Sequence, residues 1–206
     1  MKIKVCGMRE PGNLADIAVH RPDFIGLIFW PKSPRFVEDC PAQMWDGLPD
    51  GMKRVGVFVN ADRAYIRRQT VRYRLDLVQL HGDETPDFCE AVSRDCPVIK
   101  AFGVETEEDL IWTLQYEGTC DYFLFDAKTT QRGGAGVKFD HTVLGTYPGG
   151  TPYFLSGGIG PEDAAAIKDF NDDRCVAVDV NSRFEISPAV KNAELMGQFI
   201  QEMRNK

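Results

Sequence analysis

The chain repeats one pattern along its length: a short apolar run, then a polar or glycine-rich segment, then residues with helical spacing. Each apolar run has the length expected of a buried strand. The eight runs are Ile3–Val5, Phe24–Phe29, Val55–Val59, Leu77–Leu80, Val98–Ala101, Tyr122–Phe125, Tyr153–Leu155 and Val176–Val180.

Helices are expected between most of these runs. The predicted helices are Gly12–Val19, Ala61–Arg72, Pro86–Ser93, Glu107–Gln115, Pro161–Phe170 and Ala193–Met203. Residues 41–48 and 141–144, after the second and sixth runs, predict only short helices. Strands that alternate with helices are parallel and are joined by crossovers. Eight such units favour an α/β fold of the closed (β/α)8 TIM-barrel type over an open, doubly wound sheet.

The length and composition fit one barrel domain spanning residues 1–206. A chain of 206 residues is near the lower end for this fold, and no linker divides it. The composition is 43% hydrophobic and 27% charged, which is enough apolar material for a large core.

Charge and cysteine usage narrow the classes of partner. The net charge of -7 argues against nucleic acid and anionic membranes, which bind basic surfaces, so an anionic ligand must be held by local donors. No apolar run is long enough for a signal peptide or a membrane span, which predicts a cytoplasmic protein. None of the six cysteines forms a C-x-x-C pair, so zinc-ribbon and thioredoxin-like sites find no support and free thiols are expected.

The first strand ends in a candidate catalytic thiol. In a (β/α)8 barrel the chemistry lies at the carboxyl ends of the strands, and here Cys6-Gly7 occupies that place. Lys4 and Cys6 share one face of the strand, and a lysine inside a barrel needs a partner. Asp179, on the neighbouring last strand, is the predicted partner of Lys4. From these residues alone Cys6 is a nucleophile, a general base or a buried core cysteine.

The sixth strand ends in a candidate acid. Asp126 is predicted to face the pocket with Leu124, and the glycine-rich segment Gln131–Gly136 predicts a loop that folds over a ligand. The alternative is an aspartate that caps a turn, which is common at strand ends.

Two loops predict a phosphate site. Gly157 and Gly158 follow the seventh strand, and Asn181 and Ser182 follow the eighth. Glycines let backbone amides approach an anion closely, and the loops after strands seven and eight frequently bind phosphate in this fold.

Two further strand ends carry polar residues. Arg35 lies in a loop braced by Pro31 and Pro34, which suits a contact with a carboxylate but also a solvated basic loop. His81 ends the fourth strand and is expected to line the pocket, with a structural hydrogen-bonding role favoured over catalysis.

Together these motifs resemble the phosphoribosylanthranilate isomerase family along nearly the whole chain. The matching segments are Lys4–Arg9, Phe29–Arg35, Val55–Asn60, Val78–Glu84, Phe125–Lys128 with Gly133–Gly136, Ser156–Gly158 and Asp179–Ser182. The resemblance implies an Amadori rearrangement of N-(5-phosphoribosyl)anthranilate to 1-(2-carboxyphenylamino)-1-deoxyribulose 5-phosphate in tryptophan biosynthesis.

The resemblance also implies residue roles. Asp126 would be the general acid that protonates the ribose ring oxygen, and Cys6 the general base that removes the proton from C2. The implied substrate-binding residues are Arg35, for the carboxylate, Gly157, Gly158, Asn181 and Ser182, for the phosphate, and Asp179 and His81. No metal or other cofactor is implied, because the Schiff-base intermediate is its own electron sink. The implied partner is a small phosphorylated substrate, and the chain is a monomer or a homodimer.

Some positions depart from the family pattern. Ala127 and Ala135 stand where hydroxyl residues are frequent, and His141 where a tryptophan is usual. Asn181 replaces a common serine, and Ala189 follows Pro188 where the family usually has glycine. These departures concern the loops and the phosphate geometry and leave the acid, the base and the arginine in place.

Two alternative functions remain open from the sequence. A related isomerase of histidine biosynthesis performs the same rearrangement on another phosphosugar, but that family has an aspartate where Cys6 stands. A non-catalytic phosphosugar-binding barrel is expected to lose the acid or the base, and here both are present.

Overall fold

The computed structural model describes residues 1–128 and 141–205. Within these residues, eight parallel strands close into a barrel in chain order, with β1 beside β8. The strands are β1 Lys2–Val5, β2 Phe24–Ile28, β3 Lys53–Phe58, β4 Leu77–Leu80, β5 Val98–Val104, β6 Tyr122–Ala127, β7 Tyr153–Leu155 and β8 Cys175–Val180. The predicted barrel is therefore confirmed.

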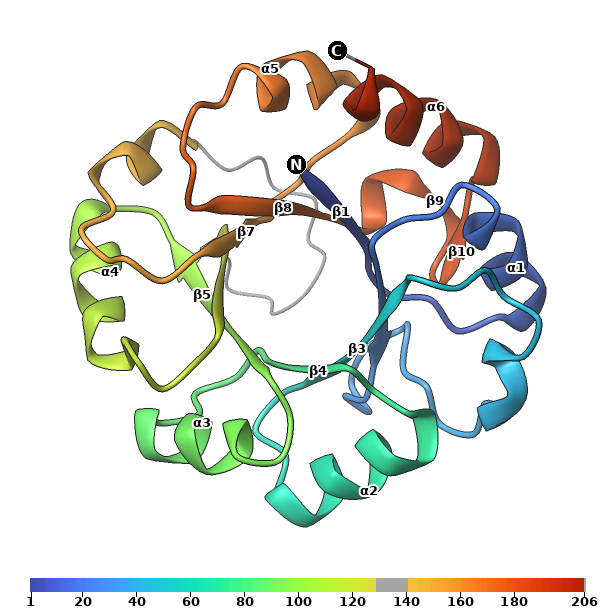
Figure 1. Ribbon diagram of the computed structural model, residues 1–206, viewed down its shortest axis with the longest axis horizontal. Helices are drawn as coiled ribbons and strands as arrows, with labels where there is room; N and C mark the ends of the chain where they lie inside the picture. The colour runs from blue at the N-terminus through green and yellow to red at the C-terminus, as the bar shows by residue number, and fades with distance from the viewer. Residues whose placement is uncertain (129–140, 206) are drawn as a thin grey trace.

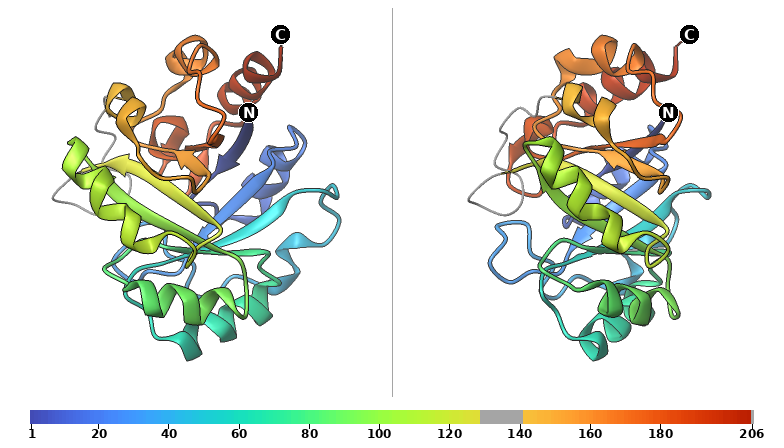
Figure 2. Two further views of the ribbon diagram at one scale, coloured as in Figure 1. Left: turned by 60° about the vertical axis from the view of Figure 1, so that its left-hand side comes forward. Right: turned by 90° about the vertical axis from the view of Figure 1, so that its left-hand side faces the viewer.

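Helices surround the barrel on all sides (Figure 1), and both chain ends lie close together at one end of the molecule (Figure 2). The α-helices are α1 Pro11–Ala18, α2 Arg63–Tyr73, α3 Pro86–Ser93, α4 Glu107–Trp112, α5 Ala164–Lys168 and α6 Ala193–Arg204. The 3-10 helices are η1 Ala42–Trp45, η2 Thr113–Tyr116, η3 His141–Thr146, η4 Pro161–Asp163 and η5 Ser182–Phe184. Among the described helices, none has the length and apolar character needed to cross a membrane.

The predicted elements agree closely with the structure, and two helices differ in type. The expected helix Glu107–Gln115 is α4 followed by η2, where Thr113 Oγ1 donates to the carbonyl of Leu110 and tightens the last turn. The expected helix Pro161–Phe170 begins as η4, where Asp163 accepts a hydrogen bond from the amide of Gly160. The segments after the second and sixth strands are short 3-10 helices, as predicted.

Side chains of the strands point alternately into the barrel interior and outward to the helices. One layer fills the barrel interior and consists of Phe24, Val55, Leu77, Ile99, Ala101, Leu124, Phe154 and Ala177. Ile3 and Val5 of β1 point outward into the larger core between the strands and helices. Cys6 packs with Ile28 and Val57 in a smaller cluster of its own. Lys4 and Cys6 therefore lie on the inner face of β1, as the period-2 pattern predicted.

A small hairpin follows β8 and was not predicted. Its antiparallel strands, β9 Glu185–Ser187 and β10 Val190–Lys191, lie between α6 and α1 (Figure 1). Asn13 of α1 pairs with the backbone of Lys191, donating to its carbonyl and accepting from its amide, each at 2.8 Å. Strands of two and three residues are too short to produce a detectable hydrophobic period, so the sequence pattern gave no sign of them.

Candidate active site

The Cys6 thiol lies just beyond the carboxyl end of β1 and is 4% exposed. Its backbone amide donates to the carbonyl of Val180, which extends the pairing of β1 with β8 by one residue. On the other side, a Cβ at Gly26 of β2 would lie 2.8 Å from the Cys6 sulfur. Gly26 therefore provides the room that the thiol occupies, a role that sequence reasoning missed because Gly26 lies inside an unbroken strand pattern.

The predicted pairing of Lys4 with Asp179 is confirmed. The two residues are register partners on β1 and β8, and Lys4 Nζ lies 2.7 Å from Asp179 Oδ1. The Lys4 side chain is completely buried and that of Asp179 is nearly so. The charges of both partners act on the neighbouring Cys6 thiol. Asp179 uses Oδ1 for Lys4, and a direct contact of Asp179 with substrate stays a prediction.

The protonation of Cys6 is decided mainly by burial. Burial raises the pKa of the Cys6 thiol above its ordinary value, and the positive charges of Lys4 and Lys191 lower it in part. The negative charge of Asp179 acts in the same direction as burial. The expectation that Lys4 favours the thiolate is right in direction, but desolvation outweighs it. Cys6 is therefore a protonated thiol at neutral pH, and its thiolate is a strong base when it forms.

Asp126 is the penultimate residue of β6 and shares the face of Leu124, which packs inside the barrel. Burial, with the negative charge of Asp179, raises the pKa of Asp126 to about 6. Its Oδ1 accepts a hydrogen bond from the amide of Ala127 at 2.9 Å, and its Oδ2 lies 3.7 Å from His81 Nε2. A carboxyl group with this pKa retains a proton in part of the molecules near neutral pH, as a general acid requires.

His81 lies beside the acid and is oriented by Gln79. The amide nitrogen of Gln79, inside the barrel on β4, is 2.9 Å from His81 Nδ1. With Gln79 as donor, Nδ1 accepts and Nε2 carries the proton, which then points to Asp126. His81 thus lies beside Asp126, while a contact of His81 with substrate stays a prediction.

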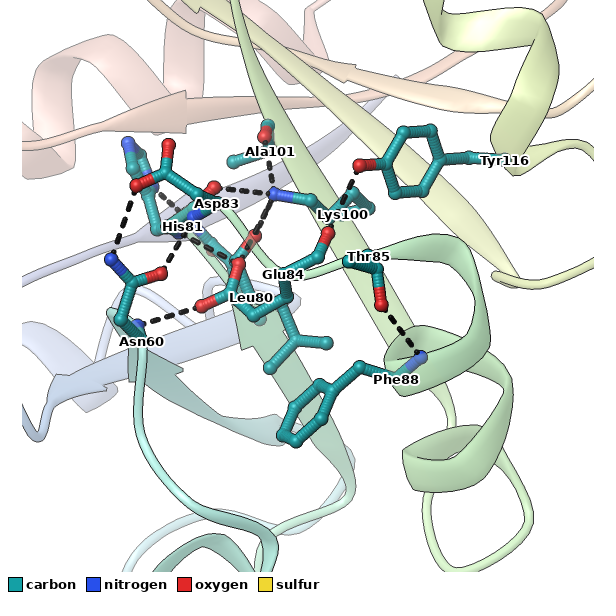
Figure 3. Close-up of polar contacts among 12 residues, drawn as sticks. Asn60, Leu80, His81, Asp83, Glu84, Thr85, Phe88, Lys100, Ala101 and Tyr116 are labelled. Atoms are coloured by element: carbon teal, nitrogen blue, oxygen red, sulfur yellow. Dashed lines mark hydrogen bonds and ion pairs between the residues drawn. The ribbon is translucent and has the colours of Figure 1, made fainter.

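A buried ion pair holds the loop that carries His81 (Figure 3). Lys100 Nζ donates to the carbonyl of Gly82 at 2.8 Å and lies 3.2 Å from Glu84 Oε2. Glu84 also accepts from the amides of Asn60 and Gly82, at 2.8 and 2.9 Å. Sequence reasoning missed this support, although a lysine inside an apolar strand is the kind of residue that requires a partner.

Arg35 is buried at the mouth of the pocket and is paired with Glu185. Its Nε and Nη2 donate to Glu185 Oε1 and Oε2 at 2.7 and 2.6 Å, a bidentate arrangement. Arg35 is 7% exposed, so the solvated-loop alternative is wrong for this residue. Its third nitrogen, Nη1, makes no hydrogen bond within the described residues. Contact of Arg35 with a carboxylate stays a prediction, with Nη1 as the donor that remains.

The two predicted phosphate loops follow the adjacent strands β7 and β8. Gly157 and Gly158 have φ values of 96° and 65°, which glycine adopts readily. In the part of the chain that the structure describes, the amides of Gly157, Gly158 and Ser182 donate to no protein acceptor. The side-chain oxygen of Asn181 accepts from Lys191 Nζ at 2.6 Å. The donors that these loops offer to a phosphate are therefore the backbone amides and the side-chain nitrogen of Asn181, whose oxygen only accepts.

The glycine-rich segment Gln131–Gly136, with Ala135, lies outside the described residues. The adjoining Lys128 is exposed, and its Nζ lies 2.7 Å from Asp109 Oδ1.

Gly7 is required at its position for two reasons. Its φ is 77°, and a Cβ there would lie 2.7 Å from both Arg35 Cδ and Asn181 Oδ1. Gly7→Ala is therefore expected to lower the free energy of unfolding by about 1–2 kcal/mol through left-handed strain, and to raise KM by displacing Arg35 and Asn181. Denaturant unfolding and steady-state kinetics measure the two effects.

Gly145→Ala is the matched control, since Gly145 is exposed and a Cβ there would meet no atom within 4 Å. An unchanged KM in Gly7→Ala would show that Arg35 and Asn181 do not need their present positions.

Comparison with known proteins agrees with this geometry. Residues 3–202 match the family model for N-(5'-phosphoribosyl)anthranilate (PRA) isomerase. The chain is 46% identical to N-(5'-phosphoribosyl)anthranilate isomerase of Parabacteroides distasonis, over 98% of this chain and 93% of that protein.

Solved structures give the same result. One, described as monomers of the dimeric phosphoribosylanthranilate isomerase of Thermotoga maritima, has a TM-score of 0.82 at 29% identity and covers 99% of this chain and 98% of that one. Another, a phosphoribosylanthranilate isomerase in complex with reduced 1-(o-carboxyphenylamino)-1-deoxyribulose 5-phosphate, has a TM-score of 0.82 at 28% identity, with the same coverage. This chain belongs to the phosphoribosylanthranilate isomerase family.

Proposed function

We infer that this protein is an isomerase of tryptophan biosynthesis, which converts N-(5'-phosphoribosyl)anthranilate to 1-(2-carboxyphenylamino)-1-deoxyribulose 5-phosphate. One observation carries the chemical part of this inference. A carboxyl group with a pKa of about 6 and a buried thiol with a raised pKa both lie at the carboxyl ends of the barrel strands, around one Lys4–Asp179 ion pair. These are an acid and a base of the kind that an aldose–ketose isomerisation uses.

The proposed mechanism has three steps. Asp126 gives its proton to the ribose ring oxygen, and the ring opens to a Schiff base at C1. The Cys6 thiolate removes the proton from C2, and the electron pair moves to the C1–nitrogen unit to form an enolamine. The enol proton is then replaced by a proton at C1, which leaves a ketone at C2. Proton exchange with solvent returns Cys6 and Asp126 to their starting forms, so substrate and product have the same atoms.

The two anionic ends of the substrate have separate donors in this proposal. Arg35 Nη1 would bind the anthranilate carboxylate, and the amides of Gly157, Gly158 and Ser182 would bind the phosphate. The acidic chain, with a net charge of -7, offers no general attraction for such a ligand, so these local donors are what would hold it.

Turnover tests the inference directly. Purified protein is mixed with freshly generated phosphoribosylanthranilate, and the loss of substrate fluorescence is followed. We expect enzyme-dependent loss that saturates with substrate. A folded sample that leaves the fluorescence unchanged would overturn the proposed function.

The protonation states predict an unusual pH dependence of kcat/KM. The active form needs a protonated Asp126 and a deprotonated Cys6, yet the pKa of Asp126 is about 6 and that of Cys6 is raised. Above pH 6 the protonated fraction of Asp126 falls about tenfold per pH unit while the thiolate fraction rises about tenfold. We therefore expect a flat profile from about pH 7 to about 8.5, the ordinary pKa of a thiol.

Asp126→Asn serves as the diagnostic variant. The asparagine does not titrate, so its residual kcat/KM should rise by about tenfold per pH unit over the same range, as the thiolate forms. A flat profile in this variant would show that Asp126 is not the acid, and a wild-type profile that falls from pH 7 would contradict the raised pKa of Cys6.

A further inference from the structure

Glu185 binds two buried cations at once. Its Oε1 accepts from Arg35 Nε and Lys191 Nζ, both at 2.7 Å, and its Oε2 accepts from Arg35 Nη2 at 2.6 Å. Lys191 is 1% exposed, and its ammonium also donates to Asn181 Oδ1 at 2.6 Å. The three charged side chains form a closed group, which we call the Arg35–Glu185–Lys191 cluster.

The charge of this cluster does not balance. Two cations share one carboxylate, so the cluster carries one net positive charge beside the pocket. If Glu185 faced Arg35 alone, the bidentate pair would be neutral. The carboxylate of a ligand would then be attracted only weakly to Arg35. Because Lys191 uses part of the same carboxylate, one positive charge is left for an anionic ligand. A net charge buried without compensation is costly, which favours binding of such a ligand.

The hairpin that carries both residues is itself fixed to the barrel. The amide of Ala189 donates to Glu185 Oε1 at 3.1 Å, and Asn13 pairs with the backbone of Lys191. Ala189 has a φ of 68°, which is the conformation that the family's usual glycine would adopt readily. The turn thus directs an amide and an ammonium at the same carboxylate oxygen.

We propose that Lys191 is a positioning residue that sets the affinity for both ends of the substrate, through Glu185 and Arg35 at the carboxylate end and through Asn181 at the phosphate end. This inference rests on the proposed function for the identity of the two ends. Arg35 and Asn181 lie side by side next to Gly7, since a Cβ at Gly7 would be 2.7 Å from an atom of each. Holding the Asn181 side chain also fixes the backbone that leads into the Ser182 amide.

The experiment measures binding of two fragments without turnover. N-methylanthranilate, followed by its own fluorescence, reports the carboxylate end, and inorganic phosphate, followed by calorimetry, reports the phosphate end. Lys191→Met is expected to weaken the binding of N-methylanthranilate by about tenfold or more, although Arg35 is intact. This is the contribution of one charge-assisted hydrogen bond. The same variant is also expected to weaken the binding of inorganic phosphate several-fold. Arg35→Ala should weaken the binding of N-methylanthranilate and leave the binding of phosphate unchanged.

Glu185→Gln separates charge from position. The variant gains a positive charge in the cluster but loses the carboxylate that orients Arg35 and Lys191. A positioning role predicts weaker binding of N-methylanthranilate, whereas tighter binding would mean that only net charge matters and would overturn the proposal. This variant also serves if Lys191→Met does not fold.

Arg174→Met is the matched control for the loss of a cation. Arg174 pairs with Asp172 just before β8, at the opposite end of the barrel. Its replacement by methionine should change the thermal midpoint without changing the affinity for either fragment. Unchanged affinities in Lys191→Met, with only its thermal midpoint lowered, would reduce Lys191 to a structural residue. Because neither fragment is converted, these outcomes are read independently of whether the isomerase assay succeeds.

Discussion

Cys6→Ser and Asp126→Asn are each expected to lower kcat by about 10²–10⁴-fold, the usual contribution of one general acid–base group. Serine has nearly the size of cysteine, but its hydroxyl ionises far less readily than a thiol, so the base is lost with little change in packing. Asparagine has the shape of aspartate and no proton of suitable acidity to give. Single-turnover and steady-state rates with phosphoribosylanthranilate measure both losses.

Stability is the control measurement for this pair of variants. Asp126 is held by one amide hydrogen bond at the end of β6, and its burial costs energy when it is ionised, so Asp126→Asn should not lower the thermal midpoint appreciably. Cys96→Ser is the matched control for the thiol, since Cys96 is buried just before β5, at the other end of the barrel. It should affect stability and leave kcat unchanged. A loss of only a few-fold in Cys6→Ser would mean that another group is the base.

Features that depend on local periodicity were predictable from the sequence. The barrel and most of its elements follow from eight apolar runs, and the inner face of β1 follows from strict alternation. The Lys4–Asp179 pair could be predicted because two rules combine: a buried lysine needs an anion, and the first and last strands of a barrel are neighbours.

The support for Arg35 was not predictable in the same way. Arg35 and Glu185 are 150 residues apart, and nothing in the hydrophobic pattern places the short β9–β10 hairpin against the loop after β2. The pKa of Cys6 was also beyond sequence reasoning. Its neighbours indicated a stabilised thiolate, but the balance depends on how completely the thiol is buried, which only the packed structure determines. The charge on Lys4 was visible in the sequence, whereas the desolvation that outweighs it was not.

Lys4→Met is expected to cause the largest loss of stability of any single substitution considered. It leaves the Asp179 carboxylate buried and without its partner at 2.7 Å, which typically costs about 3–5 kcal/mol. For a chain of this length that corresponds to a fall of about 6–20 °C in the thermal midpoint. Denaturant unfolding with a fixed m-value measures the change in free energy. Lys2→Met is the matched control on the same strand, because Lys2 is exposed and should contribute less than about 0.5 kcal/mol.

The double variant Lys4→Met, Asp179→Leu tests whether the ion pair serves stability alone or also catalysis. Replacing both partners by apolar side chains removes the uncompensated charge, so most of the lost stability should return. Activity should not return, because the variant lacks the Lys4 charge that lowers the pKa of Cys6 and the Asp179 charge that raises the pKa of Asp126. Recovery of stability without recovery of kcat would assign the pair to the chemistry of the pocket. Recovery of both would show that Lys4 and Asp179 only fill the barrel. A loss below about 1 kcal/mol in Lys4→Met, the value of a solvent-exposed ion pair, would contradict a buried Lys4–Asp179 pair.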